Sequence, residues 1–148
     1  MNDQAIKDFF SAYERRVNDA LIDPLKIDSL GMTSAYTNNF IEASPSGVQV
    51  FQNNEQFVTA LGPAFEGKRQ IGTRSMSVTA LNTTIIDDLH VAVKIRWLAQ
   101  YERRKDQKAI DVEFDETYLL QSVDGKPRIF AYVAGDEQET LKKHGLLD

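Results

Sequence analysis

The feature that most constrains the fold is a change in the spacing of apolar residues near the middle of the chain. Before Thr73 they recur mainly at intervals of three and four residues, which is typical of amphipathic helices. From Thr73 onward they alternate with polar residues in long runs divided by turn signals, which is typical of strands with one buried face. This order predicts an α+β domain, with helices concentrated in its first half and a sheet in its second.

The first helix is predicted by an apolar stripe that has charged residues on its other side. The stripe consists of Ile6, Phe9, Phe10, Tyr13, Val17, Ala20 and Leu21. Asp23 is suited to cap the chain after this helix, and Pro24 is suited to open a short second helix that Gly31 closes. We expect both helices to precede the sheet.

Two short strands and a third helix complete the predicted first half. The strands span residues 35–43 and 48–51, with the turn Ser44-Pro45-Ser46-Gly47 between them. In the helix, Asn53 and Gln56 resemble a capping box, and an apolar stripe follows. Gly62-Pro63 is expected to bend or loosen the end of this helix.

The second half predicts a meander of four antiparallel strands. In the second of these strands one face carries Leu89, Val91, Val93, Ile95, Trp97 and Tyr101, and the other carries His90, Lys94, Arg96 and Gln100. In the third strand Glu116 shares the apolar face with Ile110, Val112, Phe114, Tyr118 and Leu120. Asp111, Glu113 and Asp115 face the other way, where they are placed to pair across strands with Lys94 and Arg96.

The last strand carries apolar residues on both faces. Phe130, Tyr132 and Ala134 alternate with Ile129, Ala131 and Val133. Apolar residues on both sides of a strand indicate burial on both sides. The following C-terminal helix, residues 136–144, is short and has only Leu141 as an interior apolar residue, so we expect a homodimer packed through the outer sheet face.

Composition limits the number of domains, the chemistry of the site and the kinds of partner that we expect. A chain of 148 residues forms one domain, 1–148, with a core that needs no disulfide or metal. The absence of cysteine excludes thiol nucleophiles and cysteine-ligated zinc, and suits the cytoplasm, as does a polar start without a signal-peptide pattern. The net charge of −5 disfavours nucleic acid as a partner, and no apolar run is long enough to cross a membrane.

The predicted element order resembles the nuclear-transport-factor-2-like superfamily, which includes SnoaL-type cyclases, scytalone dehydratase and ketosteroid isomerase. Three stretches carry the resemblance: Tyr13 within the first helix, Tyr36-Thr37-Asn38-Asn39-Phe40 ending in Ser44-Pro45-Ser46-Gly47, and Gly125-Lys126 through Ala134-Gly135-Asp136. The resemblance implies a cystatin-like cone, in which three helices of the N-terminal half pack on a strongly bent, mainly antiparallel sheet and enclose a pocket. It also implies a tendency to dimerise. Members range from enzymes to non-catalytic binders, so the fold leaves the function open.

Glu116 and Tyr13 are the candidate catalytic residues. A carboxylate between Phe114 and Tyr118 on the inner face would lose solvation and its pKa would rise, so it could transfer a proton. The alternative is that a bulge turns Glu116 outward, or that it pairs with a buried hydroxyl. Tyr13 could direct its hydroxyl at a developing oxyanion, although most tyrosines in such a stripe are structural.

The catalytic residues of three mechanisms known in this superfamily are missing from the corresponding positions of this chain. Ketosteroid isomerase has an aspartate base before a proline, where this chain has Ser44 before Pro45. Scytalone dehydratase uses pocket histidines, whereas His90 is expected on the outer face and His144 in the C-terminal tail. Limonene epoxide hydrolase uses an Arg-x-Asp step, where this chain has Arg96-Trp97-Leu98.

Aromatic residues are the candidate walls of the pocket. Together with one amide they are Tyr36, Asn38, Trp97, Tyr101, Tyr118 and Tyr132. Each aromatic residue alone is more often plain core, whereas the group as a whole favours a lined pocket. Asp87, Asp88 and His90 at one hairpin tip, and Arg103-Arg104-Lys105 at the next, are interpreted as solvated turns, so no metal site is predicted.

The sequence therefore leaves open whether the pocket catalyses a reaction. The first hypothesis is an isomerase, dehydratase or cyclase that needs no metal or organic cofactor and acts on a small, apolar or aromatic, oxygenated molecule. The second is a protein that binds such a hydrophobic ligand without reaction. The third is a protein-interaction module that uses the outer sheet face, where the last strand would expose Ile129, Ala131 and Val133.

Overall fold

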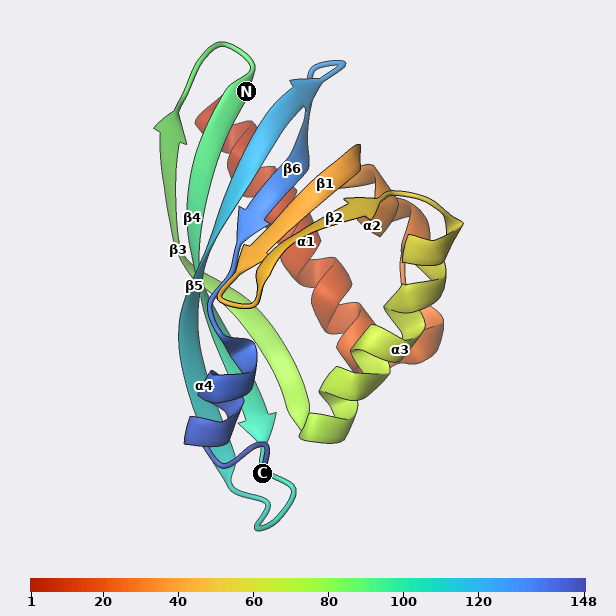
Figure 1. The fold of residues 1–148 in the computed structure, drawn as a ribbon, viewed down its shortest axis with the longest axis vertical. Helices are drawn as coiled ribbons and strands as arrows, with labels where there is room; N and C mark the ends of the chain where they lie inside the picture. The colour runs from red at the N-terminus through yellow and green to blue at the C-terminus, as the bar shows by residue number, and fades with distance from the viewer.

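The computed structural model describes all 148 residues and contains six strands in one bent sheet, with helices on its concave side (Figure 1). The elements are α1 Asp3–Ile22, η1 Pro24–Lys26, α2 Ser29–Ser34, β1 Tyr36–Ser44, β2 Gly47–Gln52, α3 Glu55–Ile71, β3 Thr73–Ile85, β4 His90–Glu102, β5 Ala109–Val123, β6 Lys126–Val133 and α4 Glu137–Lys143. No helix has the length and apolar character needed to cross a bilayer. The predicted α+β class is confirmed.

The sheet is open and mixed, with the strand order β2-β1-β6-β5-β4-β3. All neighbouring strands are antiparallel except β1 and β6, which run parallel. The predicted meander over the four last strands is confirmed. Because β1 returns to pair with β6, the two chain halves share one sheet, and α1 lies across its concave face (Figure 1).

The main core lies between α1 and the middle of the sheet. Its largest fully buried side chains include Phe10, Trp97, Ile95, Leu120 and Ile129. Burial of each such side chain contributes roughly 1.5–3 kcal/mol. The predicted first helix is confirmed, and Asn2 caps it by accepting a hydrogen bond from the backbone N–H of Ala5 at 2.8 Å.

The segment after α1 differs from the prediction of one short helix closed by Gly31. Pro24 opens only the 3-10 turn η1, and α2 is a separate helix that contains Gly31. The reason is a second cap: the Asp28 side chain accepts a hydrogen bond from the Gly31 N–H at 2.9 Å. A Cβ at position 31 would lie 2.2 Å from the same carboxylate, which explains the glycine.

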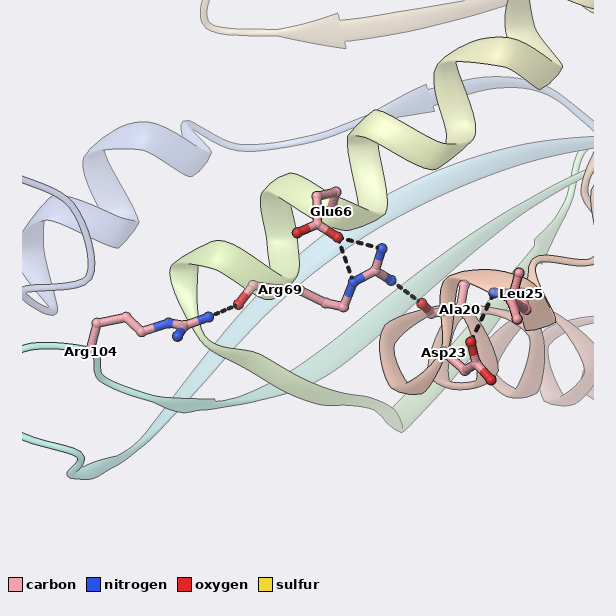
Figure 2. Close-up of polar contacts among 6 residues, drawn as sticks. All are labelled: Ala20, Asp23, Leu25, Glu66, Arg69 and Arg104. Carbon is pink, nitrogen blue, oxygen red and sulfur yellow. Dashed lines mark hydrogen bonds and ion pairs between the residues drawn. The ribbon is translucent and has the colours of Figure 1, made fainter.

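Helix α3 also differs from its prediction. Its cap is Asn54 rather than Asn53, and the helix continues through Pro63 to Ile71 instead of loosening there. Two arginines donate to carbonyl groups in the last turns of helices (Figure 2). Arg69 donates to the carbonyl of Ala20 in the last turns of α1, and Arg104 donates to the carbonyl of Arg69 itself at 2.7 Å. Arg104, interpreted as part of a solvated turn, thus supports the end of α3.

The two faces of the long strands are largely as predicted. Val91, Val93 and Trp97 are buried on the concave side, and on the other side Asp115 pairs with Arg96 at 3.0 Å and with Lys94 at 3.7 Å. Leu89 is the exception. It lies in the turn before β4 and is exposed, because β4 begins only at His90.

A β-bulge in β6 corrects the predicted faces of the last strand. Leu119 pairs with Ala131 but Leu120 pairs with Ile129, so Phe130 is an extra residue. Ile129 is therefore buried in the core, not outside as predicted. The exposed apolar residues on the outer side of this end of the sheet form what we call the outer apolar surface, which consists of Ile41, Val48, Val50 and Val133.

Candidate functional site

A cavity of about 380 Å³ lies between α4 and the concave face of the sheet. It is lined from β1 by Glu42, from α3 by Lys68, from β5 by Glu116 and from α4 by Glu137. Its apolar lining consists of Met76, Tyr101, Val112, Phe114, Ala134 and Leu141. Burial of Leu141 in a cluster with Tyr101 and Val112 holds α4 beside this opening.

Glu116 ends a short chain of hydrogen bonds that begins in the core. The indole N–H of Trp97 donates to the hydroxyl of Tyr118 at 3.1 Å, and that hydroxyl donates to Oε2 of Glu116 at 2.6 Å. An indole N–H can only donate and an ionised carboxylate can only accept, so the Tyr118 hydroxyl accepts from Trp97 and donates to the charged form of Glu116.

The Oε1 atom of Glu116 makes no hydrogen bond within the chain. No buried side-chain oxygen or nitrogen lacks a partner, so this atom must retain access to solvent, and Glu116 lines the cavity. Burial raises the pKa of Glu116, while the Tyr118 hydrogen bond and the charge of Lys68 act in the opposite direction. The residue is thus an acid with a raised pKa and one oxygen available to a ligand.

A second carboxylate, Glu42, was not singled out from the sequence. Its Oε2 accepts a hydrogen bond of 2.5 Å from the Tyr132 hydroxyl, and Glu42 lines the same cavity as Glu116. The two sites are neighbours through the sheet, because Tyr132 pairs with Glu42 on one side and with Tyr118 on the other. The available signal was strand alternation, since Glu42 lies two residues beyond the buried Phe40.

Tyr13 lies outside this cavity. It lines a smaller apolar cavity of about 100 Å³ together with Tyr36, and the two hydroxyl oxygens share a hydrogen bond of 2.8 Å. Burial raises the pKa of Tyr13 to about 12, so its phenol stays neutral in ordinary buffers. Its ring lies 6.1 Å from those of Trp97 and Tyr118. Tyr13 and Glu116 therefore do not line the same cavity. The Tyr118 ring packs beside Tyr13, and its hydroxyl binds Glu116.

The other predicted wall residues divide into three groups. Tyr101 lines the large cavity, and burial raises its pKa to about 12. Trp97 and Tyr118, 1% and 2% exposed, lie behind the cavity in the core. Asn38 is exposed and lines neither cavity, and it lies in the part of β1 where the pairing with β6 is irregular, between Tyr36 and Ile41. The walls are therefore more acidic than the aromatic pattern predicts.

Asp87, in the turn before β4, forms a hydrogen bond with His90, the first residue of that strand. His90 Nδ1 lies 2.7 Å from Asp87 Oδ1, and its Nε2 lies 3.1 Å from the side-chain nitrogen of Gln121. Both ring nitrogens are thus engaged by side chains on the outer part of the sheet. Neither histidine lines the large cavity.

Residues 2–137 match the model of a family described as NTF2-like protein (DUF6841). The chain belongs to this family. The resemblance to the nuclear-transport-factor-2-like superfamily is therefore confirmed over nearly the whole length. No curated protein matches the chain.

Solved structures show the same NTF2-like fold at low sequence identity. An NTF-2 like protein of unknown function from Shewanella oneidensis is 17% identical, with a TM-score of 0.65 over 92% of this chain and 100% of that chain. An NTF2-like protein with a cystatin-like fold from Novosphingobium aromaticivorans is 8% identical, with a TM-score of 0.66 over 98% and 88%. A ketosteroid isomerase-like protein from Erwinia carotovora is 12% identical, with a TM-score of 0.58 over 90% and 91%. These likenesses concern the fold alone.

Proposed function

We propose that this NTF2-like protein binds a small organic molecule in the large cavity and exchanges a proton with it through Glu116. The reaction class is that of a cofactor-independent isomerase, dehydratase or cyclase acting on an oxygenated molecule. One observation carries the proposal: Oε2 of Glu116 is occupied by the Tyr118 hydroxyl, whereas Oε1 is unpaired and the residue lines the cavity. A carboxyl group held in this way presents its proton, or its free lone pairs, to a ligand.

The neighbouring groups have distinct roles in this proposal. Tyr118 and Trp97 hold the Glu116 carboxyl group in one orientation. Glu42, held by Tyr132, supplies a second carboxyl group, so that one acid can donate a proton while the other accepts one. Tyr13, first considered as an oxyanion donor, instead supports the Tyr118 ring.

Proton exchange with solvent deuterium tests this proposal for any ligand that has an acidic C–H group. Small ketones and hydroxyketones are screened for binding by ligand-detected NMR, and each binder is incubated with protein in D₂O. We expect the wild type to replace a C–H proton next to the carbonyl by deuterium, and Glu116→Gln to bind the same compound with at least a hundredfold slower exchange. Glu113→Gln is the matched control, because Glu113 lies on the same strand with an exposed side chain.

Two outcomes contradict catalysis by Glu116. If Glu116→Gln retains the wild-type exchange rate, another group transfers the proton. If the wild type binds compounds but exchanges no proton, the protein is a non-catalytic binder of small ligands. That alternative is supported by the absence of a histidine from the cavity wall, and recovery of an unchanged ligand from purified protein would favour it.

We further propose that two copies pair through the outer apolar surface. Val48 and Val50 are each 69% exposed and Val133 is 51% exposed, on strands at the same end of the sheet. Val50→Lys is expected to convert a dimer into a monomer in sedimentation experiments. Leu25→Lys, at a 92% exposed position in η1, is expected to leave the dimer intact. A wild-type monomer at micromolar concentration would reject the homodimer, and a different chain captured at this face would favour the interaction-module hypothesis.

A further inference from the structure

The charged groups of the large cavity are unevenly matched. The wall contains the carboxyl groups of Glu42, Glu116 and Glu137 but only one basic side chain, Lys68. The Lys68 ammonium forms its ion pair with Glu137, at 3.6 Å, and although its charge also acts on Glu116, it forms no ion pair with Glu116 or Glu42. Glu42 and Glu116 have only phenol donors, from Tyr132 and Tyr118.

The two other acidic residues of the wall are already engaged elsewhere. Asp115 pairs with Arg96 and Lys94 on the outer face of the sheet. Asp136 caps α4 by accepting a hydrogen bond from the backbone N–H of Glu139 at 3.0 Å. Glu42 and Glu116 are therefore the two acidic groups of the cavity that lack a cationic partner.

The hydrogen-bond donors that contact the two acids come from the tyrosines. Each tyrosine hydroxyl donates to one carboxyl group, and the Thr140 hydroxyl donates to the Asp136 carbonyl at 2.9 Å. Ser44, Ser46 and Gln138 also line the cavity, but their side chains do not donate to Glu42 or Glu116. One oxygen on each acid therefore remains as an acceptor. A ligand that brings donors would complement these oxygens, and a positive charge would match the acids best.

The rest of the wall defines the other end of the ligand. Met76, Val112, Phe114 and Leu141 provide apolar surface, and Val112 and Leu141 belong to one buried cluster. The volume of about 380 Å³ accommodates a molecule with a single aromatic ring and a short side chain. The cavity thus combines an acidic region with an apolar region.

We propose that the cavity selects an amphipathic amine, whose ammonium group lies between Glu42 and Glu116 and whose hydrocarbon body packs against Phe114 and Leu141. This inference rests on the proposed binding function and specifies the class of ligand. An ammonium group donates three hydrogen bonds and would satisfy the free oxygens of both carboxylates. Charge-assisted hydrogen bonds of this kind are about twice as strong as neutral ones.

A series of three near-isosteric probes tests the ligand class. The affinities of 2-phenylethylamine, 2-phenylethanol and 3-phenylpropanoate are measured by isothermal titration calorimetry at pH 7. We expect the amine to bind at least tenfold more tightly than the alcohol, and the carboxylate to bind most weakly. Emission from Trp97, the one tryptophan of the chain, provides a second readout because its indole is linked to Glu116 through Tyr118.

Substitutions of Glu42 and Glu116 test whether these two acids cause the preference for the amine. In Glu42→Gln and in Glu116→Gln the ratio of amine to alcohol affinity is expected to fall at least threefold, whereas Glu113→Gln should retain it. The ratio is compared within each variant, so a partly unfolded sample does not affect it.

The outcomes separate the two proposals. If the alcohol or the carboxylate binds as tightly as the amine, the amine inference is rejected while ligand binding in the cavity stands. If the amine preference survives both substitutions, the inference is also rejected, because the acids do not cause it. If none of the three probes binds, the amine inference is rejected, and the binding proposal is decided by the separate screen of ketones and hydroxyketones.

Discussion

The two ends of the concave face use tyrosine in different ways. Under α1, the hydroxyls of Tyr13 and Tyr36 bind each other inside the packed core. Toward α4, the hydroxyls of Tyr118 and Tyr132 bind the carboxyl groups of Glu116 and Glu42, which line the large cavity. The residue type is the same, and the partner differs.

The partner decides whether a free polar atom remains for a ligand. A phenol pair is electrically neutral and can be enclosed without a charged group being desolvated. A carboxyl group has a second oxygen, so a tyrosine that binds one oxygen leaves the other free, as in Glu116. The α1 end therefore keeps its polar atoms paired within the fold, whereas the α4 end leaves a carboxyl oxygen free for the proposed ligand.

Substitution of Trp97 tests the structural end and should have the largest effect. Trp97 is 1% exposed, so Trp97→Ala is expected to lower the free energy of unfolding by about 3–5 kcal/mol, because a large void forms in the packed core. Phe114→Ala is the comparison, since Phe114 is partly buried and already borders the cavity. Urea unfolding followed by circular dichroism measures both. An equal loss in the two variants would show that the ends do not differ in packing.

The fold was largely predictable because apolar period and turn chemistry are local properties. They were sufficient for α1, for the four-stranded meander and for the pairing of Asp115 with Lys94 and Arg96. The errors arose where distant segments decide the local structure. The bulge at Phe130 depends on how β6 pairs with β5, and it moved Ile129 into the core.

The site was less predictable than the fold. The aromatic pattern suggested a pocket walled by rings, but rings that fit together fill the space they surround, as Trp97 and Tyr118 do. The cavity lies instead where α4 meets the sheet, and the position of α4 depends on the burial of Leu141 against Tyr101. Glu42 was within reach of strand alternation, but its pairing with Tyr132 requires the parallel contact of β1 with β6.

A double-mutant cycle on the phenol pair should have the next largest effect. Tyr13→Phe and Tyr36→Phe are each expected to cost about 1–3 kcal/mol, because each leaves one buried hydroxyl without its partner. The double variant should cost at least about 1 kcal/mol less than the sum, because no unpaired hydroxyl remains. Urea unfolding of the four proteins measures the coupling. Additive losses would mean that the two hydroxyls do not depend on each other.

The smallest effect is expected from Glu116→Gln, and it should depend on pH. Burial raises the pKa of Glu116 above its ordinary value of 4.5, so the folded state binds the proton more tightly than the unfolded state. The associated stability is fully present below pH 4.5 and is lost as pH rises through the folded pKa. Glutamine carries no such proton, so Glu116→Gln should gain stability relative to the wild type as pH rises.

Unfolding by urea at a series of pH values from 4 to 8 measures this difference, with Glu113→Gln as the control. The groups near Glu116 act in both directions: Lys68 on α3 favours its charged form, whereas Glu42 on β1 and Glu137 on α4 oppose it. Tyr118→Phe removes the hydrogen bond that favours the charged form, so in that variant the loss of stability should continue to higher pH than in the wild type. Parallel stability curves for wild type and Glu116→Gln would show that the carboxyl group is solvated like any surface acid, and the contrast between the two ends of the concave face would lose its electrostatic basis.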